Sequence, residues 1–486
     1  MSIYAISMVV YFIIAFGIAI FYSRKRTTSN EDFFLGGRQF GIVFVFFTMM
    51  ATFLGAGTTV GTTAWIWKRG LSQVWMTAGY AFVFLFIGFF LAARVRRFGA
   101  NCNAYTFADF LEIRYNKSAR YIGATLMWFA FMSIAAFQYI GIGRIINTVT
   151  GIDYTVGVLV AALITILYTS YGGMWAIAIT GVVKGALVFT GIVIMAPILY
   201  LKAGGIQGIL SVVPAQHCSV VGYITPGQAL TWFLVFFLGI IPMQDWWQRV
   251  LSAKGEREAK MGLLYLAGGF VFIELLIYII GFAGKVLEPN IANPENLFPT
   301  LVMHYFNPYI GGLLLAAVVA IITSTAAACL LVASTHFTRD LYNGIIKPNA
   351  TDAELLRFSK ISTLGLGVLV LVFVFAAPGM FELFVISADI LGASLTVPIL
   401  AGFFVPRVGA KAGFYGILAG NVGWAISYMG WEPMGFGPAT VGAFFSLITV
   451  LIGMVVLPPA ERAVLEKLGF VEKNATAVKD SYFDKA

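Results

Sequence analysis

The sequence predicts an all-α integral membrane protein with about thirteen transmembrane helices. The chain of 486 residues is 60% apolar and only 11% charged, a composition typical of a protein that is embedded in lipid along most of its length. Apolar runs of roughly 20 residues, enough to cross about 30 Å of hydrocarbon as a helix, recur from Ile3 to about Leu457. The predicted spans are 3–22, 40–66, 72–94, 119–149, 152–170, 173–201, 228–251, 259–285, 310–338, 356–377, 379–405, 410–429 and 438–458.

The basic residues indicate how the helices are oriented. They follow spans one, three, seven, nine and eleven and recur in the C-terminal tail, whereas the alternate connections hold few. Because Lys and Arg favour the cytoplasmic side, we expect an N-terminus outside and a C-terminus in the cytoplasm, in the cell (inner) membrane. The net charge of +9 then reflects topology, and no basic patch indicates a nucleic-acid partner. The first span lacks a basic segment before it and a cleavage site after it, so we expect a retained helix.

Two spans are interrupted in a similar way. The second reads "MMATFLGAGTTVGTTAW", with glycines at 55, 57 and 61, and the seventh reads "FFLGIIPMQDWWQR", with Gly239 and Pro242. Both enter the interruption through the tripeptide Phe-Leu-Gly. Lipid cannot satisfy the backbone groups that such breaks free, so they persist where protein, water or a ligand supplies partners. Paired broken helices indicate the central binding site of a transporter, although glycines also let helices pack closely.

Counting the helices gives a repeated arrangement. Spans two to six and seven to eleven form two units of five, and an odd number makes them opposite in orientation, which predicts a 5+5 inverted repeat with one extra N-terminal and two extra C-terminal helices. The predicted division is 1–39 (extra helix and cytoplasmic loop), 40–202 (first repeat), 203–227 (external loop), 228–405 (second repeat), 406–458 (two C-terminal helices) and 459–486 (cytoplasmic tail).

Five segments together resemble the sodium:solute symporter family. They are "FFLGGRQFG" (33–41), "TFADFLEIRYNKSARY" (106–121), "SYGGMWAIAITGVVK" (170–184), "QRVLSAKGEREAKMG" (248–262) and "ASTHFTRDLY" (333–342). The resemblance covers nearly the whole chain. It implies a leucine-transporter-type fold, in which a small solute lies at mid-membrane between the two broken helices.

The resemblance also implies two sets of binding residues. The substrate would contact Gly55, Ala56, Gly57, Thr58, Gln138, Gln244, Asp245 and Trp246, and the principal sodium site would use carbonyls of Ala51, Leu54 and Ile321 with hydroxyls of Ser324 and Thr325. Neutral oxygen cages of this kind suit a hard cation. Two purely structural roles stay open: an interhelical hydrogen bond for Gln138 and a position at the membrane–water interface for Trp246.

Lys184 departs from the family pattern. Most relatives carry Thr-Asp in the sixth span and Gln three residues later, whereas this chain has Thr180, Gly181 and Lys184. Lys184 is about ten residues, or roughly 15 Å, from the predicted inner end of its helix, too deep for its stem to reach the interface easily.

Three roles are open for this lysine. It replaces the coupling sodium by carrying a proton together with Thr180, or it binds an anionic solute, or it pairs with a buried acid such as Glu274 or Asp389. A desolvated amine gives up its proton more readily than one in water, which favours a proton carrier.

The predicted function is secondary active import of a small polar organic solute by alternating access, coupled to Na⁺ or to H⁺ through Lys184. The chain has no Walker-type phosphate loop, and three scattered cysteines suggest neither a disulfide framework nor a metal site. We expect no enzyme activity and no cofactor beyond a possible coupling Na⁺. A membrane sensor with a separate signalling partner is the alternative, and a channel is a third class. The solute, a quaternary amine or an anion, and the oligomeric state stay open.

Overall fold

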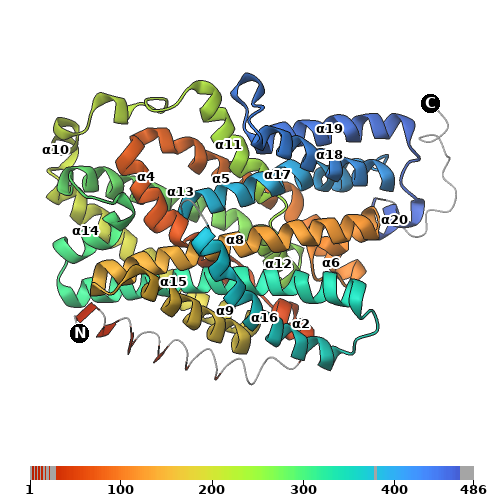
Figure 1. The fold of residues 1–486 in the computed structure, drawn as a ribbon, viewed down its shortest axis with the longest axis horizontal. Helices are drawn as coiled ribbons and strands as arrows, with labels where there is room; N and C mark the ends of the chain where they lie inside the picture. The colour runs from red at the N-terminus through yellow and green to blue at the C-terminus, as the bar shows by residue number, and fades with distance from the viewer. Residues whose placement is uncertain are drawn as a thin grey trace.

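The computed structural model describes residues 29–376 and 380–470, together with scattered positions between 3 and 21. Every regular element in this part of the chain is helical, and Phe40 and Ala253 form an isolated parallel bridge between two loops. The first predicted span and the C-terminal tail therefore fall largely outside the described residues. Figure 1 shows the described helices as a bundle whose members run mostly along one common direction.

The helices of the bundle follow the order of the predicted spans. They are α2 (Asn30–Leu35), α3 (Ile42–Phe53), α4 (Thr62–Arg69), α5 (Val74–Phe86), α6 (Ala92–Cys102), α7 (Phe107–Arg114), α8 (Lys117–Thr150), α9 (Tyr154–Lys202), α10 (Gly205–Val212), α11 (Pro226–Ile240), α12 (Gln244–Ser252), α13 (Glu256–Leu287), α14 (Leu297–Tyr305), α15 (Pro308–Thr335), α16 (Asp352–Ala376), α17 (Met380–Phe404), α18 (Ala410–Tyr428), α19 (Pro438–Val456) and α20 (Arg462–Lys467).

Membrane-spanning character is clear for the longer helical elements. Within the described residues, eight such elements, one of which joins α4, α5 and α6 as Gly57–Cys102, are long and apolar enough to cross a membrane, and the bent pair α11 and α12 makes a ninth. Two shorter apolar helices, Ile42–Phe53 and Tyr154–Leu167, add to them. The protein is thus a multi-pass membrane protein, while the count of thirteen, the domain division and the inverted repeat stay predictions.

The spans predicted at 152–170 and 173–201 form one helical element, α9, of 49 residues. A straight helix of that length would measure about 74 Å, more than twice the thickness of the hydrocarbon core. Its two parts, Tyr154–Leu167 and Ile177–Lys202, are each apolar. The element is therefore long enough for two passages.

The core of the bundle is built on α15 and α8. The apolar stretch of α15 is buried along its whole length, whereas those of α16 and α19 are buried over less than half of theirs. α15 packs against α8 and α9, and α17 packs against α8, α11 and α18. The outer helices present large apolar side chains such as Val372 and Phe444 at the surface, as expected where lipid is the solvent. The centre of the bundle is thus formed by α15 and α8, the helices whose apolar stretches are buried most completely.

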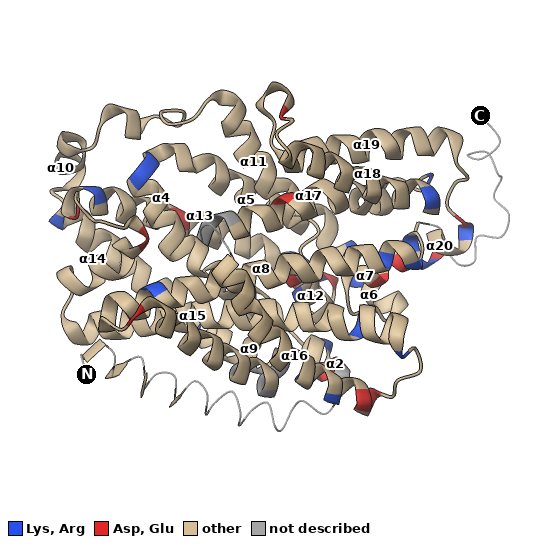
Figure 2. Ribbon diagram, in the orientation of Figure 1, with Lys and Arg blue, Asp and Glu red and all other residues tan. Residues whose placement is uncertain are grey.

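Local sequence fixes where several helices begin. α7 and α11 each start with a capping box, in which a Thr hydroxyl and the side chain three residues later close the first turn: Thr106 with Asp109, and Thr225 with Gln228. Such boxes satisfy backbone N–H groups that would otherwise lack partners. Charged residues gather towards the two ends of the bundle, and the end with α6, α7 and α20 carries many of the Lys and Arg residues (Figure 2).

Candidate functional site

The first interruption lies between α3 and α4. α3 ends at Phe53, and after Leu54 and Gly55 the chain continues through a π-helical stretch, Gly57–Gly61, into α4. Two hydroxyls on the far side turn back to satisfy carbonyls on the near side: Thr58 donates to Phe53 O and Thr59 to Gly55 O. The predicted break in this span is therefore present.

Side chains from other helices supply the remaining partners of this break. Gln138 on α8 accepts a hydrogen bond from Ala56 N–H at 2.9 Å. A Cβ at Gly55 would lie 2.9 Å from Gln138 Oε1 and 3.1 Å from the Thr325 side chain, so only glycine permits this approach. The first break is thus held between α8 and α15.

The second interruption separates α11 from α12 with a bend of 42°. Its free carbonyls are satisfied by the tryptophans that open α12. Trp246 Nε1–H lies 2.9 Å from Ile240 O and 3.1 Å from Ile241 O, and Trp247 Nε1 lies 3.2 Å from Ile241 O. A Cβ at Gly239 would lie 2.6 Å from Ala388 O, so the end of α11 packs directly on α17.

A cavity lies between the two interruptions. The space in it that water-sized molecules can occupy is about 70 Å³, and the empty space with its open mouth included is about 720 Å³. Both broken helices contribute to its wall, and α5, the turn before it, α8, α13, α15 and α17 supply the rest. The described lining residues are Thr52, Phe53, Gly55, Gly57, Thr58, Thr62, Gln73, Met76, Thr77, Tyr80, Phe131, Ile134, Phe137, Gln138, Phe236, Ile240, Met243, Asp245, Glu274, Thr325, Cys329 and Phe384.

The cavity gathers most of the residues predicted to contact the substrate. Gly55, Gly57, Thr58, Gln138 and Asp245 all line it. Ala56 lies behind them and donates its N–H to the amide oxygen of the glutamine.

Two of the predicted substrate residues have other contacts. Gln244 Oε1 accepts from Phe107 N at 2.7 Å, and its amide lies 3.3 Å from Tyr105 O, so this side chain ties the start of α12 to the start of α7. Trp246 is fully buried and donates to α11. In the structure, Trp246 therefore stabilises the second break, and Gln244 stabilises the contact between the second break and the start of α7.

The residues predicted for a cation site meet where α3 and α15 touch. The Thr325 hydroxyl lies 3.1 Å from Ala51 O, 3.2 Å from Thr52 O and 3.1 Å from Ile321 O. Leu54, also predicted for the site, is fully buried one turn beyond Met50, whose carbonyl accepts its N–H. This geometry assembles neutral oxygens of the kind that hard cations prefer.

Lys184 reaches the same place from α9. Its Nζ donates to Ser324 Oγ at 2.7 Å, and its side chain is only 2% exposed. One turn earlier on α9, a Cβ at Gly181 would lie 3.6 Å from the Ala51 side chain, so this face of α9 packs on the end of α3. Thr180 is buried beside it. An ammonium group thus hydrogen-bonds to a hydroxyl that was predicted to bind sodium.

The two buried acids that were considered as partners for Lys184 have contacts elsewhere. Glu274 Oε2 accepts from the Thr77 hydroxyl at 3.1 Å, and Asp389 Oδ1 accepts from Ala439 N at 3.3 Å. Glu274 lines the central cavity, whereas Asp389 lines a second pocket between α11 and α17.

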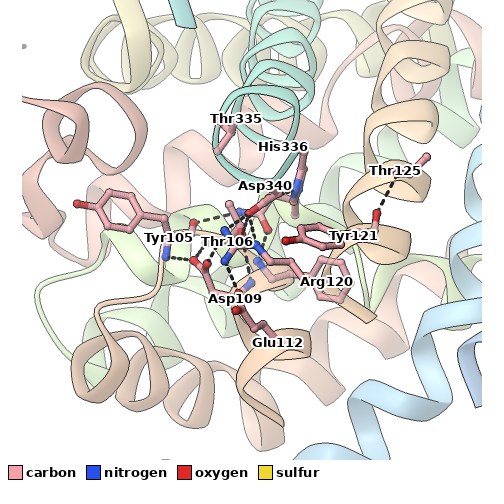
Figure 3. Close-up of polar contacts among 12 residues, drawn as sticks. Tyr105, Thr106, Asp109, Glu112, Arg120, Tyr121, Thr125, Thr335, His336 and Asp340 are labelled. Atoms are coloured by element: carbon pink, nitrogen blue, oxygen red, sulfur yellow. Dashed lines mark hydrogen bonds and ion pairs between the residues drawn. The ribbon is translucent and has the colours of Figure 1, made fainter. Parts of the chain in front are cut away.

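A second polar cluster joins two of the motif segments, 106–121 and 333–342 (Figure 3). Arg120 on α8 lies 2.6 Å from Asp340 and 3.2 Å from Asp109, and it also contacts Glu112. His336 Nδ1 lies 2.6 Å from Asp340 Oδ2. The cluster fixes α7 and the start of α8 to the π-helical extension of α15, His336–Ile346. Its buried charges are paired, as buried charges must be to avoid a large cost.

Sequence reasoning missed part of the cavity wall. Gln73, Thr77 and Tyr80 recur at intervals of four and three residues, which places them on one face of α5 and the turn that leads into it, and all three line the cavity. This polar stripe in an apolar span was the signal that could have identified them.

An all-helical membrane protein with two interrupted helices around a central cavity has the architecture of a secondary transporter. The sequence profile of the sodium:solute symporter family matches residues 33–420. The chain therefore belongs to this family of solute symporters.

Individual relatives agree with this assignment. The chain is 27% identical to the sodium/pantothenate symporter of Escherichia coli (strain K12) over 472 residues, covering 92% of this chain and 95% of the relative. It is 27% identical to the human high affinity choline transporter 1 over 455 residues, covering 88% and 77%. These relatives carry different solutes, so kinship alone does not identify the solute of this chain.

Two solved structures share the fold. A Na⁺-coupled sialic acid symporter in a substrate-bound, outward-open state superposes with a TM-score of 0.80 at 20% identity, covering 94% of this chain and 98% of the other. MHP1, a nucleobase-cation-symport-1 family transporter in a closed conformation with bromovinylhydantoin bound, superposes with a TM-score of 0.59 at 15% identity, covering 91% and 99%.

Proposed function

We propose that this chain imports a small polar organic solute held in the central cavity, and that a proton on Lys184 takes the place of the coupling sodium. The observation that carries the proposal is the 2.7 Å hydrogen bond from Lys184 Nζ to Ser324 Oγ. Solute contacts would come from Gly55, Gly57 and Thr58 on one break and from Asp245 on the other, with Gln138 between them.

Electrostatics supports an exchange of sodium for an ammonium group. Two unit charges about 4 Å apart repel by about 4 kcal/mol at an effective dielectric constant of about 20. A sodium ion on Ser324 would lie about this close to a charged Lys184, so the two cations are alternatives. Most relatives carry Asp at the position of Gly181, and an acid there would favour a bound cation. Gly181, which faces Ala51, supplies no negative charge, so its presence also disfavours sodium.

The proton would act by changing how α3 and α9 are held to α15. The charged amine attracts the oxygens at the end of α3 and on α15, as sodium does in a sodium-coupled carrier. When the amine loses its proton, that attraction is lost, and the first broken helix is released from α15. Coupling then follows because the helix that is released also lines the solute cavity.

Sodium coupling is the second candidate, and membership of the sodium:solute symporter family favours it. In that case, oxygens of Ala51, Leu54, Ile321, Ser324 and Thr325 would hold Na⁺ while Lys184 is neutral. We further propose the orientation expected from the basic connections, with the N-terminus outside and the C-terminus in the cytoplasm of the cell (inner) membrane.

Uptake into proteoliposomes tests the proposal. Labelled choline, proline and pantothenate are offered with either an inward proton gradient or an inward sodium gradient. We expect at least one solute to accumulate with the proton gradient in the absence of sodium, and Lys184→Gln to abolish that accumulation. Lys202→Gln, at the exposed end of the same helix, is the matched control and should transport normally. Uptake that requires sodium and survives Lys184→Gln would overturn the proposal.

A further inference from the structure

The charge of the central cavity identifies the class of solute that it suits. Among the described lining residues, the two that carry formal charge, Asp245 and Glu274, are both acidic. Lys184 is not among these lining residues, and its amine is directed to Ser324. The groups in the wall that can carry a charge are therefore carboxyl groups.

The two acids are balanced differently. Asp245 Oδ1 accepts from Trp246 N at 2.8 Å, and Arg249 donates to the Asp245 backbone carbonyl at 3.0 Å, so a positive guanidinium lies near this carboxylate. Glu274 is only 3% exposed and accepts from the neutral hydroxyl of Thr77. Among the described residues it has no ion-pair partner. Burial without a countercharge disfavours the ionised form of this carboxyl group, and a cationic solute would supply the missing countercharge.

A second acceptor in the cavity also lacks a partner. Gln73 is only 3% exposed, and its Oε1 has no hydrogen-bond partner in the described part of the chain. The residue lies one helical turn before Thr77, which binds Glu274, and both line the cavity. The amide oxygen of Gln73 and the Glu274 carboxyl group of α13, which Thr77 binds one turn further along, together form a surface that attracts a positive group.

Aromatic rings complete this side of the cavity. Tyr80 stacks on Phe236 with ring centroids 4.8 Å apart, and Phe236 stacks on Phe384 at 5.7 Å. Phe137 continues the series, stacked on Phe384 at 5.4 Å. All four rings line the cavity. Aromatic faces attract ammonium ions and form the cages that recognise quaternary amines.

We propose that the solute is a small organic cation, an alkylated amine or quaternary ammonium ion, whose charged centre lies between Glu274 and the ring of Tyr80. This inference rests on the proposed function, because it names the solute class for the same cavity. The remaining hydroxyls, from Thr52, Thr58 and Thr62, would hold the polar tail of such a molecule.

Binding to the purified full chain in lipid nanodiscs tests this solute class. Isothermal titration compares choline, tetramethylammonium, the uncharged isostere 3,3-dimethylbutan-1-ol and the anion pantothenate. We expect at least one cation to bind saturably, and choline to bind at least about tenfold tighter than its isostere. Glu274→Gln should weaken binding of the cation by at least about tenfold, whereas Asp389→Asn, a buried acid outside the cavity, should leave it within about twofold.

Three results would overturn the inference: no saturable binding of either cation, equal binding of choline and its isostere, or unchanged cation affinity in Glu274→Gln. The outcome is separable from that of the proposed function. If choline binds but no gradient drives its uptake, the transport proposal fails and the solute class stands. If pantothenate or proline accumulates with a gradient while the cations do not bind, the solute class alone fails.

Discussion

The two interrupted helices enter their breaks through the same tripeptide, yet they close them by different means. At the second break, Trp246 and Trp247 donate to carbonyls of the helix that directly precedes them, Ile240 and Ile241. At the first break, Thr58 and Thr59 also act locally, but further partners come from distant helices, Gln138 on α8 and Thr325 on α15. The bend of the second break is therefore closed mainly by its own tryptophans, whereas the first also depends on the relative positions of three helices.

This difference assigns the breaks different roles. A break that is closed within its own helix pair keeps its geometry when the rest of the bundle moves. A break whose hydrogen bonds reach across to α8 and α15 is sensitive to any movement of those helices, and it is also the one in contact with Lys184 through Ser324 and the neighbouring Thr325. We therefore expect substitutions at the second break to affect folding, and those at the first to affect coupling.

The largest loss of stability is expected for Trp246→Phe. The substitution removes an N–H that lies within reach of the Ile240 and Ile241 carbonyls and leaves a cavity where the fully buried indole was. The lost hydrogen bond and the cavity together cost about 2–4 kcal/mol. Thermal unfolding in detergent should show a melting temperature well below that of the native chain. Trp431→Phe, at a half-exposed loop position, is the control and should melt normally. Normal melting of both variants would show that the second break does not depend on its tryptophan.

A moderate loss is expected for Gly55→Ala. The added methyl group would lie 2.9 Å from Gln138 Oε1 and 3.1 Å from Thr325, and overpacking of this kind costs about 1–3 kcal/mol. Because the methyl group would push the end of α3 away from Gln138 and Thr325, the rate of uptake should fall severely while the melting temperature falls only moderately. Gly61→Ala, where the new methyl group would be an ordinary 3.5 Å from its nearest neighbour, should keep most of the uptake. Equal uptake in the two variants would contradict a role for the first break in coupling.

The smallest loss of stability is expected for Thr325→Val. This isosteric change removes one hydroxyl from the contact with Ala51 and Thr52, worth about 1 kcal/mol. We expect the dependence of uptake on the driving gradient to weaken while the melting temperature changes little. Thr323→Val removes a hydroxyl whose hydrogen bond, to Val319 O, lies within α15, and should preserve the gradient dependence.

Sequence patterns predicted the features that depend on local chemistry. Glycines and a proline predicted both breaks, and the depth of Lys184 in its span predicted burial of its amine. The contact between Lys184 and Ser324 belongs to one of three roles that the sequence left open for the lysine. The sequence did not decide among them, because periodicity places a residue on a helix face but does not say which helix lies opposite.

Features that depend on packing between distant helices were beyond the sequence. Gln244 was predicted to contact the solute, but its side chain contacts the start of α7. Its direction depends on where α12 begins and on which loop packs there. Glu274 was recognised as a deep acid, yet its place in the cavity wall depends on how α13 packs against α5. Physical reasoning from the sequence left open which segments lie next to one another. The resemblance to the sodium:solute symporter family indicated this for the two broken helices and for the residues of the cation site.

The effect of sodium on stability tests most directly whether an ammonium replaces the coupling ion. A ligand that binds only the folded state stabilises it by RT ln(1 + [L]/Kd), so the melting temperature rises with the logarithm of ligand concentration above Kd. At constant ionic strength and neutral pH, replacing K⁺ by Na⁺ should leave the melting temperature of the native chain unchanged, and Lys184→Gln should create a rise that grows with Na⁺ concentration. A rise with Na⁺ in the native chain that disappears in Lys184→Gln would contradict the account.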